Sequence, residues 1–483
     1  MRIGQTSFAV FASKLLGSAL GFVATLYFAR ELGASVLGSY ALVLALVAWL
    51  KLGGRLGVSS AMTKRMSEGE EPAAYATAAG IVVIALGLGL GLLVVVFDGV
   101  IESYVGADAV GSHLGVGVAA LAAVLLLVGL FESFVGSALT GERKVHIAGA
   151  LTPFGIGVRS LVQIALVTAG FGLVGMLAGY AIGGLLVGAV GATALSARPV
   201  RPERRHFEAL YEYAKFSWLG SLKSRSFNDV DVLLLGVFVQ SSLVGIYSAA
   251  WSVANFLTLF DSAVSSTLFP ELSRLDAEGR DESVAGLVED SLAYGGLFLI
   301  PGLVGGGLLG DRLLRIYGPE FVEGVHVLWI LILATLVYAY QKQLLNALNG
   351  IDRPDAAFRI NAAFVATNAL LNVVLISTVG FVGAAVATAL SAAVGLGVAF
   401  VTLRSAIDFS VPFDEIARQL LAAAAMGVVV WTAETVLETV VGFDHNFATV
   451  LVLVAVGAAT YFSVLFGLSP TFRSTVRENS PIG

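Results

Sequence analysis

The strongest constraint on this fold is a succession of apolar runs, each long enough to cross a lipid bilayer. Hydrophobic residues make up 57% of the 483 residues, and charged residues only 13%. A soluble domain carries about 25% charged residues, and about twenty apolar residues span a bilayer as a helix. The chain has too few charges to cover a soluble surface, so we predict an all-α membrane protein with many spans.

About fourteen transmembrane helices are predicted on these runs. The first is too long for the core of a signal peptide and lacks a small-residue cleavage site, so we expect it to be retained. The predicted spans lie near residues 7–29, 40–62, 74–97, 115–139, 146–169, 173–196, 213–238, 245–269, 287–309, 325–348, 358–378, 382–403, 415–437 and 448–468.

Lysine and arginine are unequally divided between the two sets of alternate loops. With the N-terminus on the inner side, the inner segments hold 17 Lys and Arg, and the outer loops hold three: Arg30, Arg312 and Arg315. Short loops rich in Lys and Arg remain in the cytoplasm. The pattern predicts a multi-pass protein of the plasma membrane with both termini in the cytoplasm.

A short motif recurs about two hundred residues along the chain. Gly38 and Tyr40 in GASVLGSYAL match Gly245 and Tyr247 in QSSLVGIYSAA, an offset of 207. Three further pairs follow in the same order, with offsets of 209, 209 and 208: Arg65 with Arg274, Gly141 with Gly350, and Gly172 with Gly380. Four matches in register indicate an internal duplication.

The duplication predicts two six-helix lobes. Because six is even, both lobes enter the membrane from the same side and form parallel repeats. We expect an N-terminal lobe at residues 1–200, a second lobe at 201–405, and an additional helix pair with a cytoplasmic tail at 406–483. The connector Ser196–His206 has two Pro and four Arg, which suits a solvated segment lying against anionic headgroups.

Eight basic residues fall inside the predicted spans, where a Lys or Arg at a helix centre costs roughly 2.5–3.5 kcal/mol on insertion scales. They are Lys14, Lys51, Arg55, Arg159, Lys215, Lys223, Arg225 and Lys342. Lys51 and Arg55 are four residues apart and share a helix face, as do Arg225 and Asn228 at a spacing of three. A Lys near a helix end can reach the membrane surface, but Lys51 and Arg159 lie too near mid-span.

We therefore predict a water-filled cavity of positive potential, suited to an anionic substrate. Its candidate substrate contacts are Lys14, Lys51, Arg55, Arg159, Lys223, Arg225, Asn228 and Lys342. The spans also contain acids, of which Glu132, Asp231 and Asp261 are candidates for ion pairing or for coupling to H+ or Na+. The alternative is that these charges form internal ion pairs that only fix helix packing.

Several kinds of chemistry lack a sequence signature. The chain has no cysteine, its five histidines are scattered, and the Asp-Val-Asp of residues 229–231 lies inside a span, so no metal site is expected. The glycine runs lie in apolar spans and suit close helix packing rather than phosphate binding. We expect no cofactor, no nucleic-acid partner and no enzymatic activity.

At FARELGASVLGSYAL, at the segment from FNDVDVLLLG to FPELSRL, and at LNGIDRP, the sequence resembles the polysaccharide flippase family of the multidrug/oligosaccharidyl-lipid/polysaccharide exporter superfamily. The resemblance covers nearly the whole chain. Relatives usually carry an Asp before the Leu-Leu-Leu-Gly, here Asp231. Many have an acidic residue late in the second span, where this chain has Arg55, so its substrate charge or coupling is expected to differ.

The resemblance implies two lobes with extra C-terminal helices, alternating access, and a polyprenyl-(pyro)phosphate-linked oligosaccharide as substrate, with membrane lipids as surroundings. Two alternatives remain open. An ion-coupled multidrug antiporter of the same superfamily would need acidic pockets, but the first span offers Lys14 and no acid. A membrane-embedded glycan polymerase or ligase would need a large outer loop.

Overall fold

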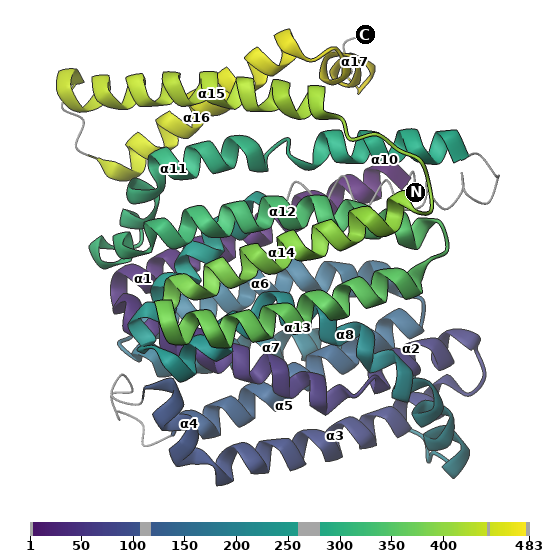
Figure 1. Cartoon of the computed structure of the whole chain (residues 1–483). Helices are drawn as coiled ribbons and strands as arrows, with labels where there is room; N and C mark the ends of the chain where they lie inside the picture. The colour runs from purple at the N-terminus through teal and green to yellow at the C-terminus, as the bar shows by residue number, and fades with distance from the viewer. Residues whose placement is uncertain (1–2, 107–116, 259–280, 442–444, 480–483) are drawn as a thin grey trace. The chain divides into compact units, whose positions relative to one another are not determined.

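The computed structural model describes residues 3–106, 117–258, 281–441 and 445–479, and every regular element in these ranges is a helix (Figure 1). The predicted all-α fold is confirmed. The described residues group into two compact units, Met1–Ser248 and Ala249–Gly483. The predicted boundary at residue 200 marks the sequence repeat and stays a prediction.

Among the described residues, the first unit contains eight labelled helices and the second also contains eight, with two short 3-10 or π segments. The first set is α1 Ile3–Arg55, α2 Val58–Glu68, α3 Pro72–Val96, α4 Asp98–Val105, α5 Val118–Gly141, α6 Val145–Thr168, α7 Gly172–Thr193 and α8 Arg204–Phe238. The second set is α10 Asp281–Gly295, α11 Leu299–Arg315, η2 Pro319–Gly324, α12 Val325–Gly350, α13 Pro354–Val379, α14 Phe381–Arg404, α15 Phe413–Val436, η3 Leu437–Val441, α16 Asn446–Leu468 and α17 Pro470–Asn479.

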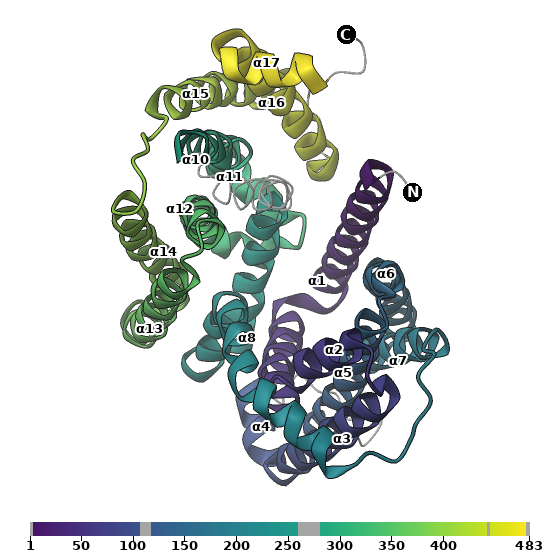
Figure 2. The ribbon, with the colours of Figure 1, turned by 90° about the vertical axis from the view of Figure 1, so that its right-hand side faces the viewer.

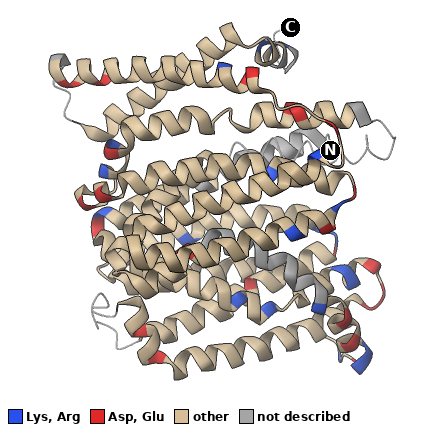
Figure 3. Ribbon diagram, viewed as in Figure 1, with Lys and Arg blue, Asp and Glu red and all other residues tan. Residues whose placement is uncertain are grey.

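Eleven helices of the described residues are long and apolar enough to cross a membrane, against about fourteen predicted. The difference has three causes. The first two predicted spans lie on one continuous element, α1. The seventh lies on α8, whose central part carries Lys223, Arg225, Asp229 and Asp231 and is too polar to be counted. The eighth, 245–269, extends beyond the described residues. Lys, Arg, Asp and Glu gather toward helix ends (Figure 3).

Helix α1 is a folded-back pair of arms rather than one rod. Its backbone leaves the helical conformation at Gly33, with φ 80° and ψ 175°, a combination open mainly to glycine. The first arm follows α6 in the same chain direction: a Cβ on Gly17 would lie 3.3 Å from the Pro153 Cα, and Tyr27 Oη is 2.8 Å from Thr168 Oγ1.

The second arm follows α5, also in the same direction, from Lys51 beside Gly129 to Arg55 beside Ser133. Helices α5 and α6 are consecutive spans joined by a short turn, so they cross in opposite directions. The two arms of α1 are therefore antiparallel, as the separate predicted spans 7–29 and 40–62 require.

The two copies of the repeated motif pack against each other in the first unit, and this contact accounts for their shared glycine. A Cβ on Gly38 would be 1.7 Å from the Ser241 carbonyl oxygen, and a Cβ on Gly245 would be 2.0 Å from the Ala34 carbonyl oxygen. Ala34 and Ser241 occupy equivalent positions in the two copies. The contact is thus reciprocal, and each glycine lets a backbone approach that no side chain would permit.

Replacing either glycine with alanine should disrupt this contact. Gly38→Ala should destabilise the purified protein by roughly 1–3 kcal/mol, seen as a thermal midpoint lowered by several degrees in detergent. The matched control is Gly136→Ala, also inside a helix, where an added Cβ meets nothing within 4 Å. Equal midpoints for Gly38→Ala and the control would contradict the predicted close contact.

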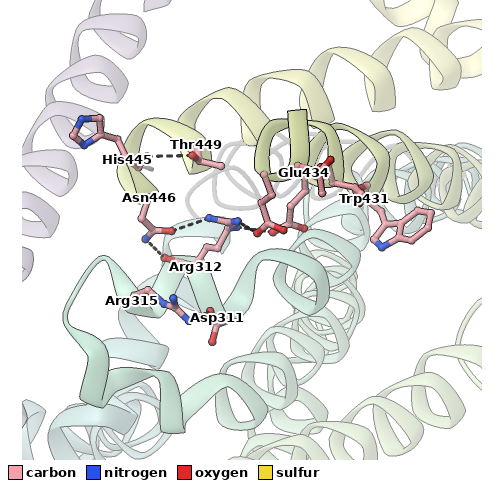
Figure 4. A network of polar contacts seen from close by, with 11 residues as sticks. Asp311, Arg312, Arg315, Trp431, Glu434, His445, Asn446 and Thr449 are labelled. Carbon is pink, nitrogen blue, oxygen red and sulfur yellow. Dashed lines mark hydrogen bonds and ion pairs between the residues drawn. The ribbon is translucent and has the colours of Figure 1, made fainter. Parts of the chain in front are cut away.

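In the second unit, α15 and α16 pack on α11 through an apolar core that includes Ile300, Met426, Val430 and Leu453. A polar network closes the same junction at one end (Figure 4). Arg312 on α11 donates from Nε to Glu434 Oε1 at 2.5 Å and pairs with Glu438.

Asn446 at the start of α16 completes this network. Its Nδ2 donates to the Arg312 carbonyl oxygen at 2.9 Å, and its Oδ1 lies 3.4 Å from Arg312 Nη1. One guanidinium therefore joins α11 to the end of α15 and the start of α16. The sequence placed Arg312 in an outer loop and Glu434 inside a span, and it gave no sign that they meet.

Neutralising Arg312 should loosen the junction, because Glu434 is only 19% exposed and would lose its cation. We expect Arg312→Gln to cost about 1–3 kcal/mol, less than a fully buried pair. Arg315→Gln is the matched control on the same helix, since Arg315 is 57% exposed and its ion pair is with Asp311, one turn away; it should cost under about 1 kcal/mol. Thermal midpoints measure both, and an Arg312→Gln midpoint equal to the control would refute the role.

Candidate functional site

One turn of α5 gathers polar side chains from three other helices of the first unit. Lys51, on the second arm of α1, packs over Gly129, where a Cβ would lie 2.8 Å from its Nζ. One turn further along, Arg55 Nη1 donates to Ser133 Oγ at 2.5 Å. The predicted shared face of Lys51 and Arg55 therefore points at α5.

Glu132, on the same turn of α5, forms an ion pair with Arg159 of α6. The Arg159 guanidinium also lies over the Tyr180 ring of α7, with 4.4 Å between its Cζ and the ring centroid, and Nη1 is 3.3 Å from Tyr180 Oη. Such a cation–π contact contributes about 2 kcal/mol when desolvated. The side chains of Arg159 and Glu132 are 17% and 24% exposed.

Glycines on α7 place these groups. A Cβ on Gly183 would lie 2.7 Å from the Arg159 Cα, and a Cβ on Gly179 would lie 2.7 Å from the Gln163 Cα. The close approach of α6 and α7 holds Gln163, which donates to Tyr40 Oη at 2.9 Å and to the Met176 carbonyl oxygen at 2.8 Å. The cluster is thus built on closely packed helices rather than on loops.

We define the basic cluster as Lys51, Arg55, Glu132, Ser133, Arg159 and Tyr180. It contains three basic side chains and one carboxylate, together with two hydroxyls. Planar guanidinium groups can bind phosphate oxygens in pairs, and hydroxyls can hydrogen-bond to sugars. In chemical terms, the cluster can hold an anion and adjoining hydroxyl groups. It offers no nucleophile paired with a base.

The structure does not bring the remaining predicted site residues into the basic cluster. Lys14 lies on α1, and Lys223, Arg225 and Asn228 lie on α8, but the placement of these side chains falls outside the described residues, as does all of Asp261. Lys342 is half-buried on α12 of the second unit. Their roles in substrate binding stay predictions.

Asp231 on α8 is buried, at 4% exposure, and accepts a hydrogen bond of 2.6 Å from Tyr247 Oη. Tyr247 belongs to the second copy of the repeated motif, and its counterpart Tyr40 bonds Gln163 instead. The two copies therefore share backbone contacts but differ in their polar partners.

Sequence reasoning missed Ser133, Tyr180 and Gln163. Gln163 could have been found, because it lies one turn after Arg159 on the same helix face. Ser133 follows Glu132 directly but carries no distinguishing pattern. Tyr180 gives no signal at all, since its place over Arg159 depends on how α7 packs against α6.

Similarity to known proteins identifies the family of this chain. Residues 27–325 match the family described as "Polysaccharide biosynthesis protein". The chain belongs to this family. It is 33% identical to the probable flippase AglR of Haloferax volcanii, over 99% of this chain and 98% of that protein. It is 31% identical to the probable low-salt glycan biosynthesis flippase Agl15 of the same organism, over 82% of each chain.

Solved structures confirm the fold of this family member. An inward closed conformation of the lipid II flippase MurJ superposes with a TM-score of 0.77 at 18% identity, covering 97% of this chain and all of that one. An inward-facing multidrug resistance MATE transporter of the MOP superfamily gives 0.57 at 16% identity. The predicted resemblance to the flippase family is confirmed by the family match and by the two flippase relatives, and the protein is a multi-span membrane protein.

A double-mutant cycle tests the Glu132–Arg159 pair. Glu132→Gln and Arg159→Gln should each lower the thermal midpoint, because each leaves a partly buried charge without its partner. The double variant should lose less than the sum, by about 1–3 kcal/mol of interaction energy. Strictly additive midpoints would contradict the pairing, and expression level controls for misfolding.

Proposed function

We propose that the protein flips a polyprenyl-(pyro)phosphate-linked oligosaccharide from the inner to the outer face of the cell membrane by alternating access. The observation that carries the proposal is the end-to-end similarity to the probable flippase AglR, at 33% identity over 99% of this chain. A second probable glycan biosynthesis flippase and the MurJ-like fold support it. On this proposal the protein transports its substrate chemically unchanged.

The basic cluster supplies the chemistry that such a substrate needs. A phosphate or pyrophosphate carries its charge through the membrane only where cations compensate it. Lys51 and Arg55 lie one turn apart, a spacing that suits two neighbouring phosphate oxygens. Ser133 and Tyr180 are available to sugar hydroxyls, while the polyprenyl chain remains in lipid.

Transport also requires a driving force, and a buried acidic residue could couple transport to an ion gradient. Asp231 and Tyr247 form a buried hydrogen-bonded pair, and Asp231 matches the acid usual in relatives. On this proposal Asp231 is the candidate for coupling to H+ or Na+. Arg55 stands where many relatives carry an acid. It distinguishes this chain from them and adds positive charge to the basic cluster.

The alternative of a multidrug antiporter is weaker. The MATE structures share the fold at 16% identity, which says nothing about substrate. A cationic drug needs carboxylates to receive it, and the one carboxylate of the basic cluster is paired with Arg159. A glycan polymerase or ligase finds no support in the names of the relatives.

Deleting the gene should leave a finished glycan on its lipid carrier, unreachable from outside the cell. Wild-type protein should restore export, whereas Lys51→Gln should reduce export to the level of the deletion strain at unchanged protein level, because the variant lacks a cation for the phosphate. The measurement is mass spectrometry of lipid-linked glycans together with surface glycan.

Arg201→Gln serves as the control, since Arg201 is an exposed connector residue outside the basic cluster. It should export like wild type. Full export by Lys51→Gln would remove the assigned contact, and a deletion strain with normal surface glycan and no accumulated carrier would refute the proposed function itself.

A further inference from the structure

Three segments of the first unit line an open surface cavity of about 650 Å³ at one end of its helices. The α2–α3 turn contributes Ser67 and Gly69, the α5–α6 turn contributes Arg143 and Lys144, and the connector contributes Arg198. Small-molecule sites commonly measure about 300–1,000 Å³. The positive-inside pattern predicts this end of the unit to face the cytoplasm, at the level of the lipid headgroups.

The connector wall of this cavity is held firmly in place. Glu142 accepts hydrogen bonds from the backbone N–H groups of Ser196, at 3.0 Å, and Ala197, at 2.7 Å, while Lys144 Nζ donates to the Ala194 carbonyl oxygen at 2.6 Å. Burial alone would raise the pKa of Glu142, but hydrogen bonds from Lys144 and from these two N–H groups outweigh it and lower the pKa. The carboxylate thus stays ionised and fixes the wall.

The connector is fastened again further along, where it passes from α7 to α3 and α8 (Figure 2). Val200 donates its N–H to Thr77 Oγ1 at 3.1 Å. His206 and Arg205 both donate to Glu71, each at 2.9 Å, and the His206 hydrogen bond and the Arg205 charge lower the pKa of Glu71. The predicted solvated connector is therefore a strap held at both ends.

Two arginines supply the charge that faces this cavity. Lys144 and Glu142 neutralise each other, with Nζ and Oε2 2.7 Å apart, which leaves Arg143 and Arg198. Both are exposed. Within the described part of the chain, the Arg198 side chain has no hydrogen-bond or ion-pair partner, and Arg143 Nη2 donates only to the Ser67 carbonyl oxygen, at 3.0 Å on the cavity wall.

Arg143 has a backbone conformation that is unusual for an arginine. Its φ is 61°, in the left-handed region, and the equivalent residue of the second repeat, Asp352, has a φ of 55°. Among residues other than glycine, Asn, Asp and His favour this region. Asp352 therefore suits the turn, whereas the conformation gives no reason for an arginine. The turn conformation alone therefore does not account for Arg143.

We propose that this cavity binds the phosphate-bearing headgroup of an anionic membrane phospholipid. Guanidinium groups from two walls can each pair with phosphate oxygens, and basic pockets at helix ends on the cytoplasmic side suit lipid headgroups. Met66, Pro72 and Val200 add apolar lining that suits the glycerol carbons. A bound lipid joins the connector to the α2–α3 and α5–α6 turns, and this role is independent of what the protein transports.

The test titrates the purified full-length protein in detergent with dihexanoyl phosphatidylglycerol, and in parallel with dihexanoyl phosphatidylcholine and inorganic phosphate. Binding is followed by thermal midpoint and native mass spectrometry. Phosphatidylglycerol should bind and raise the midpoint, and Arg198→Gln should weaken its binding about tenfold. Arg143→Gln should act in the same direction. Arg201→Gln, three residues along the same connector and outside the cavity lining, should bind like wild type.

Four results would overturn the proposal. They are equal stabilisation by phosphatidylcholine, equal stabilisation by inorganic phosphate, an Arg198→Gln variant that binds phosphatidylglycerol like wild type, and equal losses for Arg198→Gln and Arg201→Gln. Arg198→Gln protein keeps its strap contacts, so a lower affinity at an unchanged lipid-free midpoint separates lost binding from misfolding. None of these outcomes depends on glycan export.

Discussion

A charge inside a membrane protein must be solvated by the protein itself, and the arrangement of helices in both units depends on this constraint. Arg159 is surrounded by Glu132 and the Tyr180 ring, each from a different helix. Arg312 meets Glu434 and Asn446 in the same way. In each unit one guanidinium stands where three helices meet, so these contacts fix the packing angle between helices that apolar side chains alone would leave adjustable.

The two copies of the motif share the glycines that allow close backbone contacts, but their polar side chains have different partners. Gly38 and Gly245 make equivalent backbone contacts, each with the other copy of the motif. The tyrosines two positions later have separate partners, one an amide and one a carboxylate. A glycine at a close backbone contact cannot be replaced without a clash. A polar side chain, by contrast, can change its hydrogen-bond partner with little change in helix packing.

Most of the fold could be predicted from the sequence, because span length and loop charge are local properties. The apolar runs and the break between predicted spans 7–29 and 40–62 are local signals of this kind. Side-chain pairings depend on residues far apart in the sequence: Arg312 and Glu434 are separated by 122 residues. Hydropathy indicates how deep a residue lies in the membrane, but not which neighbouring helix its side chain faces. For the same reason the sequence predicted Arg159 in a wet interior but could not supply Tyr180, the ring against which it packs.

The Glu132–Arg159 pair also limits how the basic cluster can work under the proposed function. A phosphate that approaches Arg159 competes with a carboxylate already bound to it, and Glu132 would then repel the incoming charge. Lys51 and Arg55 lie one turn apart beside α5, next to Gly129 and the Ser133 hydroxyl. Under the proposed function these two residues are the candidates to receive the substrate phosphate. Arg159 is better suited to hold α5, α6 and α7 in register.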